Sequence, residues 1–97
     1  MAKLLDEYSE KAYFEGGRYV LATQIWVVDD RRYLHGVKYS LIFIDTKTSK
    51  KVLLDNHHPK GPHVHLDDDE FSYEYKSEKQ LVLDFRSFVY QHFGVKI

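Results

Sequence analysis

The sequence predicts an α+β fold in which an antiparallel sheet of about five strands is closed by one C-terminal helix. Three observations predict it. Segments with strand-like alternation recur along the chain, short turns rich in Gly or charge separate them, and one helical pattern follows near the C-terminus. The short connections favour antiparallel pairing, because parallel strands need a longer crossover.

Composition sets the limits of the fold and excludes several classes of protein. With 97 residues, the chain has room for one domain, residues 1–97, and its 15% aromatic content can fill a small core. The net charge of −1 excludes nucleic-acid binding through overall basic charge, and the lack of Cys excludes disulfides and thiolate zinc sites. Because charged residues come early and no apolar run approaches roughly 20 residues, we expect a cytoplasmic protein outside the membrane.

The N-terminal half contains the first strand signals. Residues 4–14 mix strand-like and helix-like features, and residues 15–17, Glu-Gly-Gly, predict a hairpin turn because Gly adopts positive φ at no steric cost. Residues 18–28 are rich in β-branched and aromatic side chains and predict a strand. A polar connection follows at residues 29–32.

The central strands are predicted from clear alternation. Residues 37–45 predict the next strand, residues 46–50 a turn of small and charged side chains, and residues 51–54 the start of a further strand. The aromatic rings of Trp26 and Tyr39 are predicted to lie in the core.

A last strand and the helix complete the predicted fold. Residues 67–70 predict a solvated acidic turn, and residues 71–75 alternate as a half-buried strand does. Ser77 and Gln80 predict a capping box at the start of a helix, and Gly94 predicts its end. One stripe of the helix can then face the sheet, consisting of Leu81, Phe85, Phe88, Val89 and His92.

Residues 55–65, Asp-Asn-His-His-Pro-Lys-Gly-Pro-His-Val-His, form the segment with the most chemistry, since they contain four of the six His. In an extended chain, His63 and His65 project to the same face. Imidazole exchanges protons near neutral pH, and Lys60 can reach a phosphate as a point charge. These three side chains could therefore divide the roles of general base, general acid and charge stabiliser, as in a metal-independent ribonuclease.

Two other interpretations of this segment stay open. His63, His65 and Glu70 follow the spacing His-x-His-x4-Glu, which is similar to the first metal motif of cupins and would suit zinc, manganese or iron. However, no second His-bearing segment follows, and we predict no bound metal or other cofactor. The other interpretation is a polar hairpin with exposed His and Lys and no chemical role.

The chain resembles the small TumE-type toxins of bacterial and archaeal toxin–antitoxin loci. Three runs carry the resemblance: Asp55-Asn56-His57-x-x-Lys60-Gly61-Pro62-His63-x-His65, Phe71-x-Tyr73 and Leu81-x-x-Asp84-Phe85. The resemblance implies the toxin half of a two-gene system, with a helix-turn-helix antitoxin protein as its partner.

Together, the residues and the resemblance predict a toxin-like protein, and we expect it to be an endoribonuclease that acts on RNA. The predicted catalytic residues are His63, His65 and Lys60. The predicted substrate-binding residues are Asp55, Asn56, His57 and Gly61. The alternatives are a non-enzymatic module that holds a protein partner at a sheet edge or aromatic face, and a small His-rich metalloprotein. Assembly as a homodimer is a further expectation.

Overall fold

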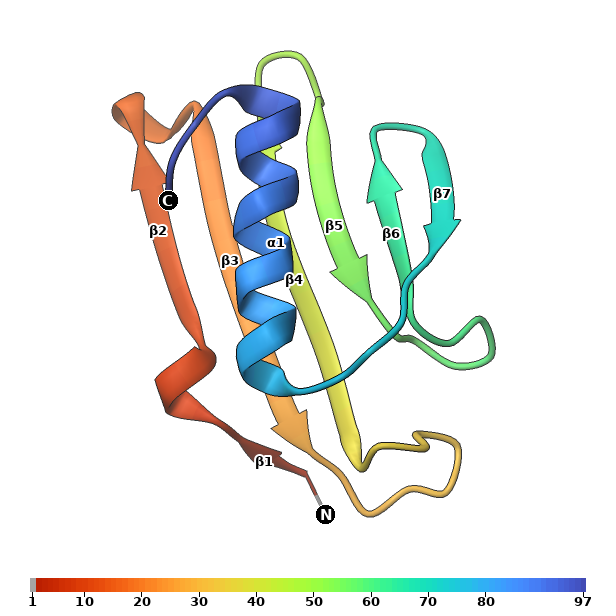
Figure 1. Cartoon of the computed structure of the whole chain (residues 1–97). Coiled ribbons are helices and arrows are strands. Elements are labelled where there is room, and N and C mark those ends of the chain that lie inside the picture. Colours follow the sequence, from red (N-terminus) through yellow and green to blue (C-terminus); the bar gives the residue numbers. More distant parts are fainter. Residues whose placement is uncertain (1) are drawn as a thin grey trace.

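The computed structural model describes residues 2–97 and shows one helix packed on one face of an antiparallel sheet (Figure 1). This confirms the predicted α+β class. The order of the strands is β1-β3-β4-β5-β6-β7, and β2 also pairs with β3. The elements are β1 (Lys3–Leu4), η1 (Asp6–Tyr8), β2 (Glu10–Phe14), η2 (Glu15–Gly17), β3 (Tyr19–Val27), β4 (Val37–Asp45), β5 (Lys51–Asp55), β6 (His63–Leu66), β7 (Asp69–Ser72) and α1 (Glu78–Phe93).

The sheet has seven strands, more than the five or so that the sequence predicts. Two come from the segment with mixed signals, where the short 3-10 helix η1 separates β1 from β2 and both strands pair with β3. A strand of two residues such as β1 is too short to leave an alternating pattern. The His-rich segment adds β6, which lies between β5 and β7.

The core lies between the sheet and α1. In β4 every second residue is buried, from Val37 to Asp45, as the predicted alternation requires. Tyr39 belongs to this core with 2% exposure. The prediction that Trp26 also lies in the core is wrong, because Trp26 is half-buried and its neighbour Ile25 takes the core-facing position in β3.

The helix begins and ends where the sequence predicts. The hydroxyl of Ser77 accepts a hydrogen bond from the backbone N–H of Gln80, and Gly94 ends the helix with a φ of 71°. The capping box is only half formed, because the side chain of Gln80 donates to Asp84 instead of returning to the cap. The charged carboxylate of Asp84 is the stronger acceptor. Leu81, Phe85 and Val89 are buried, whereas Phe88 is partly buried.

The last strand, β7, lies earlier than predicted, over residues 69–72 instead of 71–75. Asp69 and Glu70 are therefore paired with β6 and do not form part of a solvated turn. Beyond β7, the backbone N–H of Tyr73 still donates to the carbonyl of Pro62 at 3.2 Å, and its hydroxyl donates to Oδ2 of Asp84 on the helix at 2.6 Å. Burial and the neighbouring carboxylate raise the pKa of Tyr73, which keeps this hydroxyl a donor.

Asp45, at the end of β4, has a buried carboxylate. It links the turn that follows β4 to Arg18, the residue before β3. Its oxygens accept hydrogen bonds from Arg18 at 3.3 and 3.1 Å and from the backbone N–H of Lys47 at 2.9 Å. The bond from Arg18 is the main reason that the pKa of Asp45 is lowered to about 2. Since an Asp in an unfolded chain titrates near 3.9, the ionised carboxylate stabilises the fold above about pH 4.

We therefore expect Asp45→Asn to lower the midpoint of urea unfolding at pH 7, and its difference from the parent to shrink as the pH falls from about 4 towards 2. Urea titrations at a series of pH values measure this directly. Asp68→Asn, at an exposed position, is the control and should follow the parent throughout. A difference between Asp45→Asn and the parent that is constant with pH would contradict the account.

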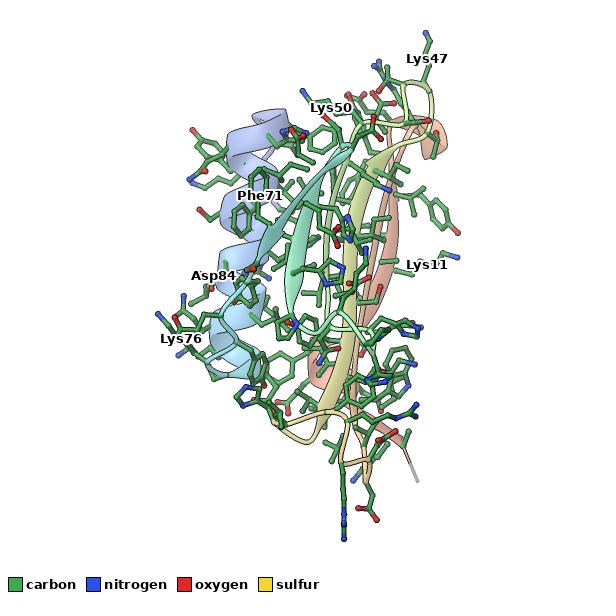
Figure 2. The ribbon with its side chains drawn as sticks, turned by 90° about the vertical axis from the view of Figure 1, so that its right-hand side faces the viewer. Lys11, Lys47, Lys50, Phe71, Lys76 and Asp84 are labelled. Atoms are coloured by element: carbon green, nitrogen blue, oxygen red, sulfur yellow. The ribbon has the colours of Figure 1, made fainter. Side chains whose placement is uncertain are left out.

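The opposite face of the sheet has no helix over it in the described part of the chain (Figure 2). Lys11 points away from α1, whereas Phe71 and Asp84 lie on the helix side. We call this the uncovered face; it is formed by the strand residues that alternate with the core positions. It includes both His of β6.

Candidate functional site

The register of three neighbouring strands brings the candidate side chains together on the uncovered face. His63 of β6 lies opposite Asp55 of β5, and His65 lies opposite Glu70 of β7. Side chains at such opposed positions have Cβ atoms about 4.5–5.5 Å apart. We call Asp55, Lys60, His63, His65 and Glu70 the histidine cluster.

The loop between β5 and β6 is held in place by Asn56, which is buried. Its Oδ1 accepts from the backbone N–H of Tyr39 at 2.9 Å, and its Nδ2 donates to the carbonyl of Val37 at 2.8 Å. Asn56 therefore extends the pairing with β4 by one residue beyond β5. At the other end of the loop, Gly61 has a φ of 75°, a conformation that favours Gly.

His63 is buried and makes close contacts through both ring nitrogens. Its Nδ1 lies 2.6 Å from the carbonyl oxygen of Gly61, and since a carbonyl only accepts, Nδ1 carries a proton. Its Nε2 lies 2.7 Å from Oδ1 of Asp55. This second contact is close but is not an aligned hydrogen bond, because Oδ1 of Asp55 is buried and accepts no hydrogen bond. The ring of His63 therefore has a protein acceptor beside each of its nitrogens.

His65 lies beside His63 in a less crowded position. The two rings are tilted by 75° with centroids 4.5 Å apart. Nε2 of His65 is 3.9 Å from Oε1 of Glu70, beyond hydrogen-bond distance, and 21% of the side chain is exposed. This nitrogen can therefore accept a proton from a group that approaches the uncovered face.

Lys60 reaches the cluster from the loop and pairs with Glu70. Nζ of Lys60 lies 3.0 and 3.2 Å from the two carboxylate oxygens, and this hydrogen-bonded cation is the main cause of the lowered pKa of Glu70. Oε1 of Glu70 is also 3.5 Å from Nε2 of His63. The ion pair is exposed, and such pairs contribute little to stability, so a phosphate could replace the carboxylate.

The structure separates the sequence-predicted site residues into two groups. His63, His65, Lys60 and Asp55 lie in the cluster, together with Glu70. Asn56 contacts only backbone through its side chain, Gly61 contributes its carbonyl, and His57 is exposed on the loop. The sequence predicts Glu70 as a candidate metal ligand and as part of an acidic turn, and not as a member of this cluster. The strand alternation of residues 69–72 would have placed it beside His65 if the boundaries of β7 had been predicted correctly.

Three members of the cluster could hold a metal ion. Asp55, His63 and His65 each offer one atom, and these atoms lie within 4.8 Å of one another. Two imidazoles and a carboxylate suit zinc, manganese or iron, and a backbone acceptor such as the Gly61 carbonyl would orient His63 for coordination. The carboxylate in this set is Asp55, whereas the sequence spacing indicates Glu70, which in the structure is paired with Lys60.

The members of the cluster differ in exposure, since His63 is buried whereas Lys60 and Glu70 are exposed. A hollow of about 500 Å³ lies elsewhere, on the helix side, lined by residues that include Tyr8, Thr23, Phe85 and Arg86 and by no member of the cluster. Within residues 2–97, we find no helix of the length and apolar character that crossing a membrane requires.

The comparisons with known proteins identify a family. Residues 3–93 match the model of a family described as toxin TumE. This range includes every strand of the sheet and the whole of α1. No curated protein and no solved structure matches the chain.

Proposed function

The chain belongs to the TumE toxin family, and from this premise we propose that it is an endoribonuclease that cleaves RNA without a metal, through its histidine cluster. Membership of a toxin family also implies an antitoxin partner. The observation that carries the proposal is the pair of imidazoles, 4.5 Å apart on an uncovered sheet face with Lys60 beside them. Two groups that exchange protons near neutral pH, and one cation, are the parts that RNA cleavage needs.

In this mechanism His65 is the general base. It takes the proton of a ribose 2′-hydroxyl, and the oxygen attacks the adjacent phosphorus. The bond from phosphorus to the 5′-oxygen breaks, and His63 gives its proton to that oxygen. The products carry a 2′,3′-cyclic phosphate and a 5′-hydroxyl, and exchange with water restores both rings.

The contacts of the two rings support this assignment of roles. The Gly61 carbonyl and Asp55, one beside each ring nitrogen, fix the orientation of His63, as a positioned acid requires. His65 has Glu70 only at 3.9 Å, which leaves Nε2 able to act as a base. Asp55 is then a positioning residue for His63.

Lys60 stabilises the charge that develops on the phosphate oxygens. It does so by exchanging its exposed pairing with Glu70 for the phosphate of the RNA. His57, exposed on the same loop, contacts the RNA. Asn56 and Gly61 contribute by fixing the loop and the ring of His63.

The partner is a helix-turn-helix antitoxin that blocks the toxin in the cytoplasm. The edge strand β7 pairs only with β6, and all four of its residues are exposed. Such an edge can receive a strand from another chain. It is therefore the place where the antitoxin, or a second copy in a homodimer, would add to the sheet.

A metal-dependent toxin is the second candidate function. The approach of Asp55, His63 and His65 favours it, together with the buried Oδ1 of Asp55 that accepts no hydrogen bond. Elemental analysis separates the two. If the toxin is metal-independent, we expect the purified protein to contain no stoichiometric metal. About one zinc, manganese or iron per chain, lost in His65→Ala, would favour the metalloprotein.

Expression in a host without the antitoxin gene tests the proposal in cells. We expect the parent to arrest growth, and His65→Ala, Lys60→Ala and His63→Gln to lose toxicity at equal expression, because each removes one part of the chemistry. His58→Ala is the matched control, since His58 is exposed on the same loop but lies outside the cluster, and it should remain toxic. Circular dichroism checks that each variant is folded.

If the folded cluster variants arrest growth as strongly as the parent, the cluster is not the site. If the parent is harmless at good expression, the toxin function itself fails, and a protein-binding module becomes the better account.

A further inference from the structure

The uncovered face continues from the histidine cluster across the whole sheet. The strand registers place its side chains in cross-strand rows, and the row that contains His65 runs back through Leu53, Ile42 and Ala22 to Lys11. Neighbouring strands are about 4.8 Å apart, so this row is about 19 Å long. Lys11 and the candidate site therefore lie at the two ends of one continuous surface.

The charges on this surface favour a polyanion. Three Lys lie on it, one each from β2, β4 and β5: Lys11, Lys38 and Lys51. Among the strand residues of the uncovered face there are two carboxylates, Asp55 and Glu70, and both belong to the histidine cluster. The rest of the face therefore has a positive charge, although the whole chain has a net charge of −1.

Aromatic rings lie beside two of these cations. Tyr13 of β2 is 61% exposed, and Nζ of Lys11 lies 5.6 Å from the centroid of its ring. Trp26 of β3, half-buried, lies opposite Lys38. Between Tyr13 and Trp26 the surface consists of small or apolar side chains such as Ala22 and Ile42. A sheet face with exposed rings and cations is how proteins stack the bases of single strands while holding their phosphates.

We infer that the uncovered face binds single-stranded RNA, which lies across β2, β3, β4 and β5 and presents one phosphate to the histidine cluster on β6. This inference rests on the proposed function and deepens it, because it names the form of the substrate. Paired bases could not stack on Tyr13 and Trp26, so a duplex binds more weakly. The antitoxin could also cover this face, because the face is partly apolar. Its three Lys side chains, and the row of residues that leads to His65, favour RNA instead.

Binding can be measured apart from catalysis. The probe is a short fluorescein-labelled single-stranded RNA with 2′-O-methyl groups, which cannot form the cyclic phosphate and so is not cleaved. Fluorescence anisotropy at several salt concentrations gives the affinity and its salt dependence for the full chain. The test variant is Lys11→Glu/Lys38→Glu. The control is Lys76→Glu/Lys79→Glu, which changes the net charge equally, with Lys76 on the helix side (Figure 2).

We expect the test variant to bind at least about tenfold more weakly than the parent, and its salt slope to fall by about 1.4, because each phosphate contact to a single strand contributes about 0.7. Tyr13→Ala should weaken binding about five- to 150-fold through the loss of stacking. The control should keep the salt slope of the parent. A duplex probe should bind more weakly than the single strand.

Other results would overturn the inference in distinguishable ways. If the test and control variants lose affinity equally, the RNA lies elsewhere, while the proposed function stands as long as the parent cleaves unmodified RNA. If the test variant binds RNA as the parent does but no longer binds the antitoxin, the face is a protein interface. If the parent neither binds nor cleaves RNA, the inference and the proposed function both fail.

Discussion

His65→Ala should lower the rate of RNA cleavage by the purified toxin about 100- to 10,000-fold, the usual loss when a general base is removed. The reason is that no other group in the cluster can replace it: His63 enters the step as the acid, and Glu70 is held by Lys60. Lys60→Ala should also lower the rate of cleavage, because the variant loses the cation that stabilises the charge on the phosphate. Lys60→Arg keeps a cation and should retain part of the rate.

The pH profile gives a second readout of the same variant. The mechanism needs His65 neutral as the base and His63 charged as the acid, so the rate of the parent should rise and then fall as the pH increases. In His65→Ala the rising limb should disappear, because that limb reports the base. His58→Ala should keep the rate and the profile of the parent.

The variants of the two His should differ in their stability to unfolding. His65 is partly exposed, so His65→Ala should unfold close to the parent. His63 is buried, so His63→Ala removes packing as well as chemistry. His63→Gln is the better variant because its amide nitrogen takes the place of Nε2 and can still donate to Asp55. A parent-like rate in folded His65→Ala would contradict the assigned role.

Phe85→Ala should lower the free energy of unfolding by about 3–5 kcal/mol, because it opens a cavity in the core between α1 and the sheet. Phe85 is 1% exposed and lies on the stripe that also contains Leu81 and Val89. Urea unfolding followed by circular dichroism measures the loss. If Phe85→Ala does not fold, Phe85→Leu should still fold and show a smaller loss.

The control for this prediction is on the same helix. Leu83 is 47% exposed, so Leu83→Ala should change the free energy of unfolding by no more than about 0.5 kcal/mol. Equal losses in the two variants would mean that α1 does not pack on the sheet through the face described.

The elements that the sequence predicts well are those whose pattern is set by burial on one face. The strand over residues 37–45 and the helix from Ser77 to Gly94 match the structure, because alternation and capping are local signals. Residues 71–75 also alternate, but only part of them lies in β7. The pairing of β7 ends where its partner ends, since Ser72 lies opposite His63, the first residue of β6, and the pattern of one segment does not report the end of another.

The candidate site was predictable to a similar extent. The spacing of His63 and His65 places both rings on one face of a strand, and the structure brings them together. The positions of Asp55 and Glu70 depend on cross-strand register, which one segment alone does not contain. The side chain of Asn56 looks available in the sequence, but its hydrogen bonds to β4 occupy it.

The chemical ends of the cleaved RNA test the central claim most directly. Purified parent protein would be incubated with unmodified single-stranded RNA in the presence of a metal chelator, and the products would be analysed by mass spectrometry. The account predicts cleavage that gives a 2′,3′-cyclic phosphate and a 5′-hydroxyl, and no cleavage where the reacting ribose lacks its 2′-hydroxyl. RNA that stays intact until zinc or manganese is added, or products that carry a 5′-phosphate, would contradict a metal-independent exchange of protons between His63 and His65.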